Sequence, residues 1–328
     1  MPEFKKNEYL KDRKLDVSVV IPLLNEEENI PILYEELTQT LAKTKFEYEL
    51  VFVDDGSSDS SLAILEKLQQ NDSHICVISL RKNFGQTAAM SAGFDMADGE
   101  VIIAMDADLQ NDPADIPMLL EKIAEGADLV TGWRYNRQDP FLSRKLPSKI
   151  ANRIISFATG VHLHDYGCTL KAFRYDVIKT IKLYGEMHRF IPAIASAMGV
   201  SIAEVKVNHR SRRFGTSKYG ISRTLRVILD LITVKFLLNY ATRPIHVFGT
   251  IGFISGSVGG LLALLLTIQR QFYGIPLSDR PLLLLAVLLI FVGVQFVTIG
   301  LVAEMLARTY HESQDKPTYY IRKVMGRE

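Results

Sequence analysis

Two apolar runs near the end of the sequence constrain the fold most. Residues 247–268 and 282–303 contain no Asp, Glu, Lys or Arg. Each run can cross the roughly 30 Å hydrocarbon layer of a bilayer as an α-helix of about 20 residues. A pair of buried core helices is the alternative, but soluble helices rarely stay free of charge over this length. The short connection contains Gly274 and Pro276, so the sequence predicts a membrane hairpin with both chain ends on one side.

Basic residues are unevenly distributed around this hairpin. Only Arg270 and Arg280 occur in the connection. The flanking segments hold more basic residues, namely Arg226, Lys235, Arg243, Arg308, Lys316, Arg322, Lys323 and Arg327. Because short cytoplasmic segments are enriched in Lys and Arg, we expect both termini to face the cytoplasm. Residues 1–14 have no apolar core, which argues against a cleaved signal peptide.

The N-terminal region alternates between two hydrophobic patterns. Four apolar segments, VSVVIPLL, YELVFVDDG, HICVISL and VIIAMDADLQNDP, alternate with helical patterns. This alternation predicts an α/β fold with a mostly parallel sheet and helices on both faces. Asn25 is expected to cap the first helix, with acidic residues in its first turn. Cys76 and Cys168 are expected to be buried thiols rather than a disulfide.

Polar residues cluster where these predicted strands end. They are Asn25, Asp54, Asp55, Asn83, Asp106 and Asp108. Ligands of parallel sheets bind beyond the carboxyl ends of the strands, although any single carboxylate here could simply close a turn. On a continuing strand, Asp106 and Asp108 would point the same way and could share one hard cation, Mg²⁺ or Mn²⁺. We interpret His162 and His164 as ordinary polar strand residues rather than metal ligands.

Several motifs then become recognisable as a set. VVIPLLNEEENI, VFVDDGSSDSS, RKNFGQTAAMSAGF and AMDADLQNDP occur in the order and spacing of family 2 glycosyltransferases with the Rossmann-like GT-A fold, and the DAD resembles that family's metal-binding Asp-x-Asp. TGWRYNR, HDYGCTLKAFRYDV and SRRFGTSKYG resemble the polyprenyl-phosphate branch, which includes bactoprenol glucosyltransferases and dolichol phosphate mannose synthases. The resemblance covers nearly the whole chain.

The resemblance implies a metal-dependent, inverting transfer of a hexose to a polyprenyl phosphate. Glucose from UDP-glucose and undecaprenyl phosphate are the first expectation. GDP-mannose, UDP-N-acetylglucosamine and an aminoarabinose donor are alternatives. A processive polysaccharide synthase and a non-enzymatic membrane scaffold are the rival classes, and no nucleic-acid partner is expected.

Specific residues follow from the same resemblance. The expected metal ligands are Asp106, Asp108 and Gln110. The expected donor-binding residues are Pro22, Leu23, Asn25, Glu26, Asp54, Asp55, Asn83, Asp106, Ala107 and Asp108. The expected acceptor-phosphate residues are Arg134, Arg144, Arg212 and Lys218. Asp165, Arg212 and Arg213 join Asp106 and Asp108 as expected catalytic residues. A structural hydrogen-bonding role competes for Asp165, and a membrane-facing role competes for Arg144.

Residues between the sheet and the hairpin follow an amphipathic pattern. Apolar residues recur at helical spacing, namely Ile221, Leu225, Ile228, Leu229, Ile232 and Phe236. This pattern favours helices at the membrane interface, with packing on the catalytic domain as the alternative. We therefore expect a cytoplasmic catalytic domain (1–218), interfacial helices (219–243), two transmembrane helices (244–306) and a cytoplasmic tail (307–328) of an inner-membrane protein. The small residues in GTIGFISGSVGG suit helix contact and a homo-oligomer.

Overall fold

The computed structural model describes residues 15–135, 152–153, 155–156, 159–183, 187–214, 245–277, 280–313 and 318–327. The chain forms two compact units, one built from Met1–Val234 with Pro317–Glu328 and the other from Lys235–Lys316. The first unit contains the sheet and the second contains two long helices. The interfacial helices expected at 219–243 lie outside the described residues, and the expected domain boundaries remain predictions.

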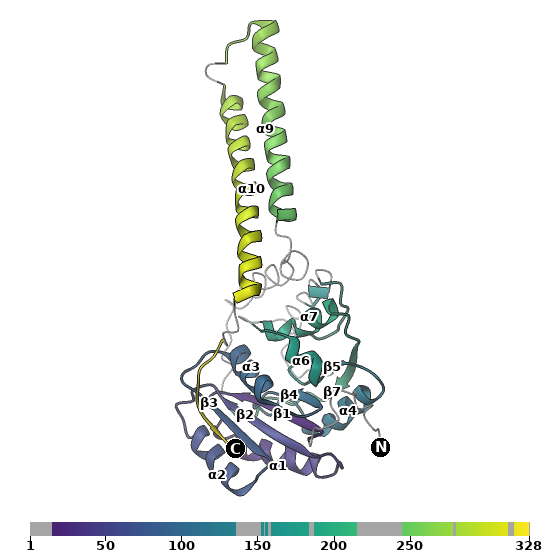
Figure 1. The fold of residues 1–328 in the computed structure, drawn as a ribbon. Helices are drawn as coiled ribbons and strands as arrows, with labels where there is room; N and C mark the ends of the chain where they lie inside the picture. Colours follow the sequence, from purple (N-terminus) through teal and green to yellow (C-terminus); the bar gives the residue numbers. More distant parts are fainter. Residues whose placement is uncertain are drawn as a thin grey trace. The chain divides into compact units, whose positions relative to one another are not determined.

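The first unit is built on one mixed sheet, whose strands follow the order β7-β5-β6-β4-β1-β2-β3-β8 in the described part of the chain (Figure 1). The strands are β1 (Val17–Leu23), β2 (Tyr48–Asp54), β3 (Ile75–Leu80), β4 (Val101–Ala104), β5 (Leu129–Arg134), β6 (Lys171–Arg174), β7 (Ile202–Val207) and β8 (Ile321–Met325). Strands β4, β1, β2 and β3 are mutually parallel, and so are β5 and β7. Strands β6 and β8 run antiparallel to their neighbours. The mostly parallel sheet expected from the sequence is confirmed.

Helices cover both faces of this sheet. They are α1 (Ile30–Leu41), α2 (Ser61–Asn71), α3 (Gln86–Met96), α4 (Ile116–Ala124), α6 (Tyr175–Thr180) and α7 (Ile191–Ala197), with 3-10 turns η2 (Pro113–Asp115) and η4 (Met187–Arg189). Side chains alternate along each strand, so Val19 and Ile21 pack with α1 and α4 in one core. Val20 and Val53 face α3, where a β-carbon at Gly93 would collide with Val20. Glycine thus allows α3 to approach the sheet closely.

Two local expectations are wrong. Helix α1 begins at Ile30 with Asn29 at its N-cap, and its first turn contains no acidic residue. Asn25 instead has a left-handed backbone with φ of 52°, and its side-chain oxygen accepts a hydrogen bond from Ser58 N at 2.8 Å. His162 and His164 lie in a loop rather than a strand. The backbone N–H of His164 donates to the side chain of Glu204 instead of to a neighbouring strand, and its ring bonds to the same carboxylate.

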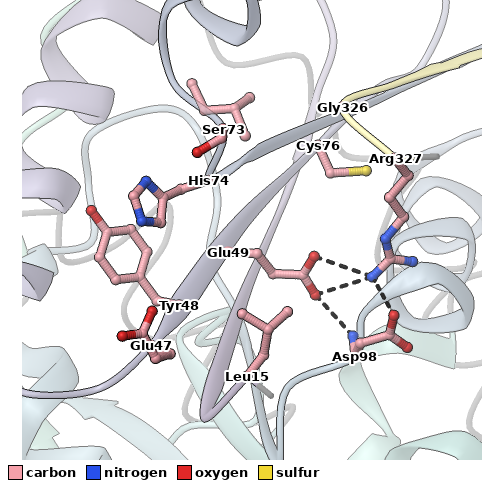
Figure 2. Close-up of a pocket in the computed structure, with 11 residues that line it drawn as sticks. Leu15, Glu47, Tyr48, Glu49, Ser73, His74, Cys76, Asp98, Gly326 and Arg327 are labelled. Carbon is pink, nitrogen blue, oxygen red and sulfur yellow. Dashed lines mark hydrogen bonds and ion pairs between the residues drawn. The ribbon is translucent and has the colours of Figure 1, made fainter. Parts of the chain in front are cut away.

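The last described residues return to the sheet of the first unit. Strand β8 pairs antiparallel with β3 and forms the edge of the sheet, as the yellow segment in Figure 1. Arg327 forms ion pairs with Glu49 (3.1 Å) and Asp98 (2.8 Å) beside a small pocket at the amino end of β2 (Figure 2). The sequence predicts only a tail for residues 307–328 and does not predict β8. The reason is that IRKVM carries little of the apolar alternation that marks a strand.

The second unit contains α9 (Ile245–Tyr273) and α10 (Pro281–Ser313). Both helices are long and apolar enough to cross a membrane, with mean hydropathy of 2.1 over Val247–Tyr273 and 2.9 over Pro281–Ala303. A β-carbon at Gly252 would meet Gly293, and one at Gly259 would meet Ala286, so the helices pack antiparallel at close range. These glycines therefore pack within the hairpin of one chain. Homo-oligomer formation remains a prediction.

Candidate active site

Two carboxylates at the end of β2 are held in place by backbone N–H groups. Asp54 accepts a hydrogen bond from Ser57 N at 3.0 Å. Asp55 accepts hydrogen bonds from Phe84 N (2.7 Å) and Gly85 N (2.9 Å). Burial raises the pKa of Asp55, and the two N–H donors oppose that shift. Both side chains are buried, and they lie at the carboxyl end of β2, where the sequence predicts them.

The loop after β1 closes over the same edge. Pro22 and Leu23 are the last residues of β1, and the carbonyl of Leu23 accepts a hydrogen bond from Asp55 N at 2.9 Å. Glu26 N donates to Ser61 Oγ at 2.9 Å, so Glu26 belongs to the loop that meets α2. Asn83 Oδ1 accepts a hydrogen bond from Gly85 N at 3.0 Å. Apart from residues 106–108, the expected donor-binding residues thus surround the carboxyl ends of β1, β2 and β3.

Asp106 and Asp108 lie in a loop, because β4 already ends at Ala104. This result corrects the expectation of a continuing strand, and the left-handed φ of 59° at Leu109 marks the turn that follows. Asp106 accepts hydrogen bonds from Gln86 Nε2 (2.6 Å) and Thr169 Oγ1 (2.8 Å), one on each oxygen. Asp108 accepts one from Gln110 N at 3.2 Å. The two carboxylates are therefore fixed by different neighbours.

Electrostatics link these two carboxylates. Burial, and after it the negative charge of Asp108, raises the pKa of Asp106 to about 6. A divalent cation between the two would relieve this repulsion, and carboxylate oxygens are ligands that Mg²⁺ and Mn²⁺ prefer. Within the described ranges, no group of three or more His, Cys, Asp and Glu side chains could hold a metal ion. The donor set present fits a hard cation that also takes substrate oxygens and water.

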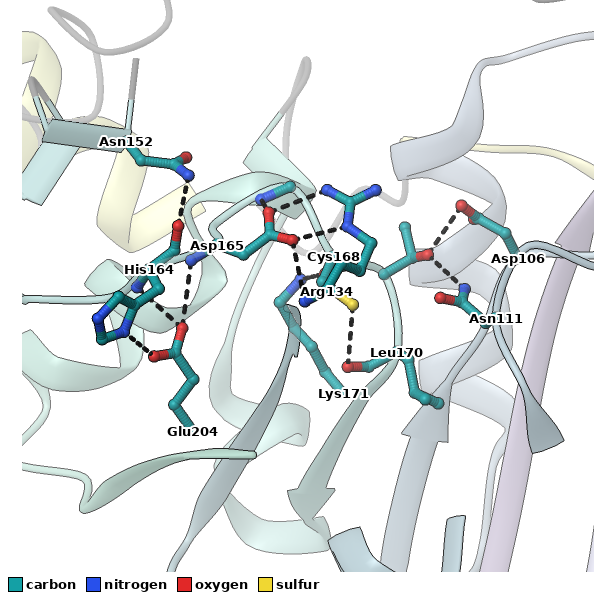
Figure 3. A network of polar contacts seen from close by, with 12 residues as sticks. Asp106, Asn111, Arg134, Asn152, His164, Asp165, Cys168, Leu170, Lys171 and Glu204 are labelled. Atoms are coloured by element: carbon teal, nitrogen blue, oxygen red, sulfur yellow. Dashed lines mark hydrogen bonds and ion pairs between the residues drawn. The ribbon is translucent and has the colours of Figure 1, made fainter. Parts of the chain in front are cut away.

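Arg134 and Asp165 form a bidentate ion pair near the loop that carries Asp106 (Figure 3). Arg134 Nε lies 2.6 Å from Asp165 Oδ2, and its Nη2 lies 2.9 Å from Oδ1. The Asp165 side chain is 3% exposed and that of Arg134 is 16% exposed. The positive charge of Arg134 also lowers the pKa of Asp106. Asp165 thus orients an arginine whose charge reaches the candidate metal site.

The remaining predicted arginines differ in their surroundings. Arg212 Nη2 donates a hydrogen bond to Asp108 Oδ2 at 2.6 Å. This contact joins the segment after β7 to the loop that carries Asp106 and Asp108. Arg213, the next residue, is exposed. Arg144 and Lys218 lie outside the described residues. The side-chain role predicted for Gln110 also stays a prediction, since its described contacts are made by backbone N–H and carbonyl groups.

The sequence does not predict a role for three buried or partly buried residues at this site, Gln86, Thr169 and Lys171. Gln86 and Thr169 donate hydrogen bonds to Asp106, and nothing in RKNFGQTAAMSAGF or HDYGCTLKAFRYDV marks them as its partners. Lys171 is 3% exposed and donates a hydrogen bond to the carbonyl of Cys168. Burial lowers the pKa of Lys171, and Asp165 and Asp106 oppose that shift. The segment 165–171 therefore joins the Arg134 ion pair to Asp106 (Figure 3).

Comparisons with known proteins show the family to which the chain belongs. The sequence profile described as Glycosyl transferase family 2 matches residues 18–182. The chain is 44% identical over 316 residues to dodecaprenyl-phosphate galacturonate synthase of Rhizobium johnstonii, covering 95% of this chain and 94% of the relative. It is 40% identical over 312 residues to undecaprenyl-phosphate 4-deoxy-4-formamido-L-arabinose transferase of Proteus mirabilis, covering 94% of each.

A solved structure shares the fold. Glucosyl-3-phosphoglycerate synthase from Mycobacterium tuberculosis, in complex with Mn²⁺, uridine diphosphate and glucosyl-3-phosphoglycerate, superposes with a TM-score of 0.52 over 70% of this chain and 82% of that chain. Its sequence identity of 17% makes this a likeness of fold alone. The predicted GT-A fold is confirmed, and the sequence relatives are polyprenyl-phosphate glycosyltransferases. The chain belongs to glycosyl transferase family 2.

Proposed function

We propose that this protein transfers a sugar from a nucleotide donor to the phosphate of a polyprenyl lipid. The observation that carries the proposal is the Asp106–Asp108 loop, which lies at the carboxyl edge of the sheet beside Arg134 and Arg212. Relatives with polyprenyl-phosphate names match 94–95% of the chain. Carboxylates that suit a divalent cation and arginines that suit phosphate therefore occur together, as the transfer requires.

The carboxylates serve the donor. Asp106 and Asp108 are the residues that would hold Mg²⁺ or Mn²⁺, which when bound stabilises the negative charge of a leaving diphosphate. Asp54 and Asp55 provide buried acceptors for the hydroxyl and N–H groups of a nucleoside. Gln86 and Thr169 keep Asp106 oriented.

The arginines serve the acceptor. A lipid phosphate is already an anion at neutral pH, so it needs orientation more than deprotonation. The guanidinium groups of Arg134 and Arg212 can share their N–H donors between a carboxylate and phosphate oxygens. We assign Asp165 to the orientation of Arg134. Direct attack by the lipid phosphate on the anomeric carbon inverts the configuration there, so an α-linked donor gives a β-linked product.

The sugar is the finer part of the proposal. Glucose was the first expectation, but the two relatives carry the names of galacturonate and 4-deoxy-4-formamido-L-arabinose enzymes. We therefore propose a UDP-linked galacturonate or 4-substituted arabinose as the donor, with galacturonate first because the 44% identical relative bears that name. UDP-glucose becomes the comparison donor.

Membrane attachment follows from hydropathy and connectivity. We propose that α9 and α10 span a membrane, since large apolar side chains such as Phe253, Phe272 and Phe291 are more than 70% exposed. Strand β8 follows α10 in the chain and lies in the same sheet as the strands that precede α9. Both ends of the hairpin would then face one compartment, and the flanking basic residues favour the cytoplasm.

A donor panel tests the proposed function. Purified full-length protein in detergent would receive undecaprenyl phosphate, Mn²⁺ or Mg²⁺, and one radiolabelled donor among UDP-galacturonate, a UDP-4-formamido-arabinose, UDP-glucose and GDP-mannose. We expect labelled lipid phosphate from one of the first two donors, none in excess EDTA, and a product whose anomeric configuration by NMR is inverted relative to that donor. Labelled polymer would indicate a processive synthase. Absence of labelled lipid with every donor would refute lipid-phosphate transfer as the activity.

A further inference from the structure

The start of strand β8 is bonded to the loop that follows β3. We call residues 81–85 the donor loop, because Asp55 accepts hydrogen bonds from the N–H groups of Phe84 and Gly85. Arg81 N donates to Tyr320 O at 2.9 Å. Arg322 Nη2 donates to the carbonyl of Arg81 at 3.0 Å. The donor loop is therefore bound on one side by Asp55 and on the other by the C-terminal strand.

An aromatic contact strengthens this junction. The rings of Tyr320 and Phe84 lie 6.0 Å apart with an interplanar angle of 46°. Lys82 Nζ lies 5.1 Å from the centre of the Phe84 ring on the same loop. Phe84 thus contacts Tyr320, the residue before β8, with its ring, and it donates its backbone N–H to Asp55.

The donor loop also packs tightly against the loop that carries Asp55. A β-carbon at Gly56 would lie 2.7 Å from the carbonyl carbon of Lys82 and 2.9 Å from Asn83 N. These are contacts with backbone atoms, which cannot swing aside as a side chain can. A displacement of residues 82–83 therefore changes the position of the end of β2, and the two loops move together.

Strand β8 is itself firmly fixed. Tyr319 Oη donates a hydrogen bond to Asp95 in α3 at 2.8 Å. At the far end, Arg327 pairs with Glu49 and Asp98 (Figure 2), and Gly326 has a left-handed φ of 84° where a β-carbon would collide with the carbonyl of Ile75. Because residues on both sides of Tyr320 are anchored, Tyr320 meets the donor loop in a fixed position.

The geometry points to a positioning role for Tyr320: the chain segment that follows the second long helix orders the donor loop and thereby raises affinity for a nucleoside diphosphate. This inference rests on the proposed function for the identity of the ligand. It assigns to residues beyond the hairpin a part in the donor site, whereas the sequence treated them as a tail. Loops that must order on binding reduce affinity, and ordering them beforehand restores it.

Three variants of the full-length protein test this role. Tyr320→Ala removes the ring, and Tyr320→Phe keeps it. Lys323→Ala is the matched control in the same C-terminal segment, since Lys323 pairs with Glu66 of α2 rather than with the donor loop. The Tyr320 side chain is 63% exposed, so its removal leaves little cavity. The first readout is hydrogen exchange in peptides covering residues 81–86, and the second is UDP binding in Mn²⁺ by calorimetry.

The expected pattern separates this inference from the proposed function. Tyr320→Ala should speed exchange in residues 81–86 and weaken UDP binding about three- to tenfold, while Tyr320→Phe and Lys323→Ala match the wild type. Wild-type exchange and affinity in Tyr320→Ala would overturn the positioning role. Failure of the wild type to bind UDP would count against the proposed nucleotide, and the exchange readout would still decide whether Tyr320 orders the loop.

Discussion

The two halves of the sheet hold their charged residues in different ways. In the donor half, which comprises β1 to β3 and the segments that follow each of them, Asp54 and Asp55 are held by uncharged backbone N–H groups. In the arginine half, which comprises β5 to β7 and the loops around them, Asp165 is held by Arg134, and Asp128 pairs with Arg174. At these positions the donor half holds its carboxylates with neutral donors, while the arginine half holds its carboxylates with positive charges.

This difference has a chemical consequence. Carboxylates that keep their charge attract a cation and accept hydrogen bonds from hydroxyl groups. Arginines that already contact carboxylates can bind a phosphate only by sharing their N–H donors. Asp106 and Asp108 stand between the halves, since Gln86 of the donor half contacts Asp106 and Arg212 of the arginine half contacts Asp108. The largest effects are expected there.

The first prediction tests this boundary. Asp106→Asn should lower transfer about a hundred- to a thousandfold, because it removes one anionic ligand at the place where leaving-group charge is stabilised. Its melting temperature should stay the same or rise, because Asn relieves the repulsion between Asp106 and Asp108 that raises the pKa of Asp106. Glu125→Gln is the matched control, since Glu125 is exposed and pairs with Lys122. Full activity of Asp106→Asn would remove Asp106 from the candidate site.

The sequence predicted the donor half better than the arginine half, for a physical reason. A carboxylate that directly follows an apolar strand must lie at the edge of the sheet, so Asp54 and Asp55 could be placed from their position alone. Ion-pair partners depend on tertiary folding, and Arg212 lies 104 residues from Asp108. The sequence also does not predict β8, because an edge strand needs less apolar surface than a central strand.

The second prediction weakens the arginine half selectively. Arg134→Ala leaves Asp165 buried without its partner, which should lower the free energy of unfolding by about 3–5 kcal/mol. Adding Asp165→Asn removes the buried charge and should recover part of that loss. Denaturant titration of the purified protein measures both effects. Equal destabilisation in the single and double variants would mean that the ion pair is not what holds this half together.

The third prediction separates two neighbouring arginines that the sequence treats alike. Arg212→Ala should lower transfer at least about tenfold, since losing a charged hydrogen bond at a partly buried site costs roughly 1.5–3 kcal/mol. Arg213 is exposed, so Arg213→Ala should have the smaller effect. Initial rates of lipid-linked product at saturating donor distinguish the two. A larger loss of transfer in Arg213→Ala than in Arg212→Ala would contradict the assignment of Arg212 to the acceptor phosphate.

The smallest expected effect lies where α3 of the donor half meets η4. His188 is buried, and its Nδ1 lies 2.7 Å from Thr87 Oγ1. Burial, with the positive charges of Arg189 and Lys171, lowers the pKa of His188 from 6.5 to about 3. The unfolded chain therefore takes up a proton before the folded protein does. The stability contributed by neutral His188 is complete above pH 6.5 and is lost progressively as the pH falls toward 3.

One pH unit below 6.5 should reduce the free energy of unfolding through this group by about 1.4 kcal/mol. His188→Gln keeps a hydrogen-bonding side chain without the titration, so the variant should lose less stability than the wild type between pH 7 and pH 5.5. Denaturant titrations at the two pH values give the comparison, with His162→Gln as the exposed control. An identical pH dependence in wild type and His188→Gln would show that the contact between the two halves does not depend on a neutral His188.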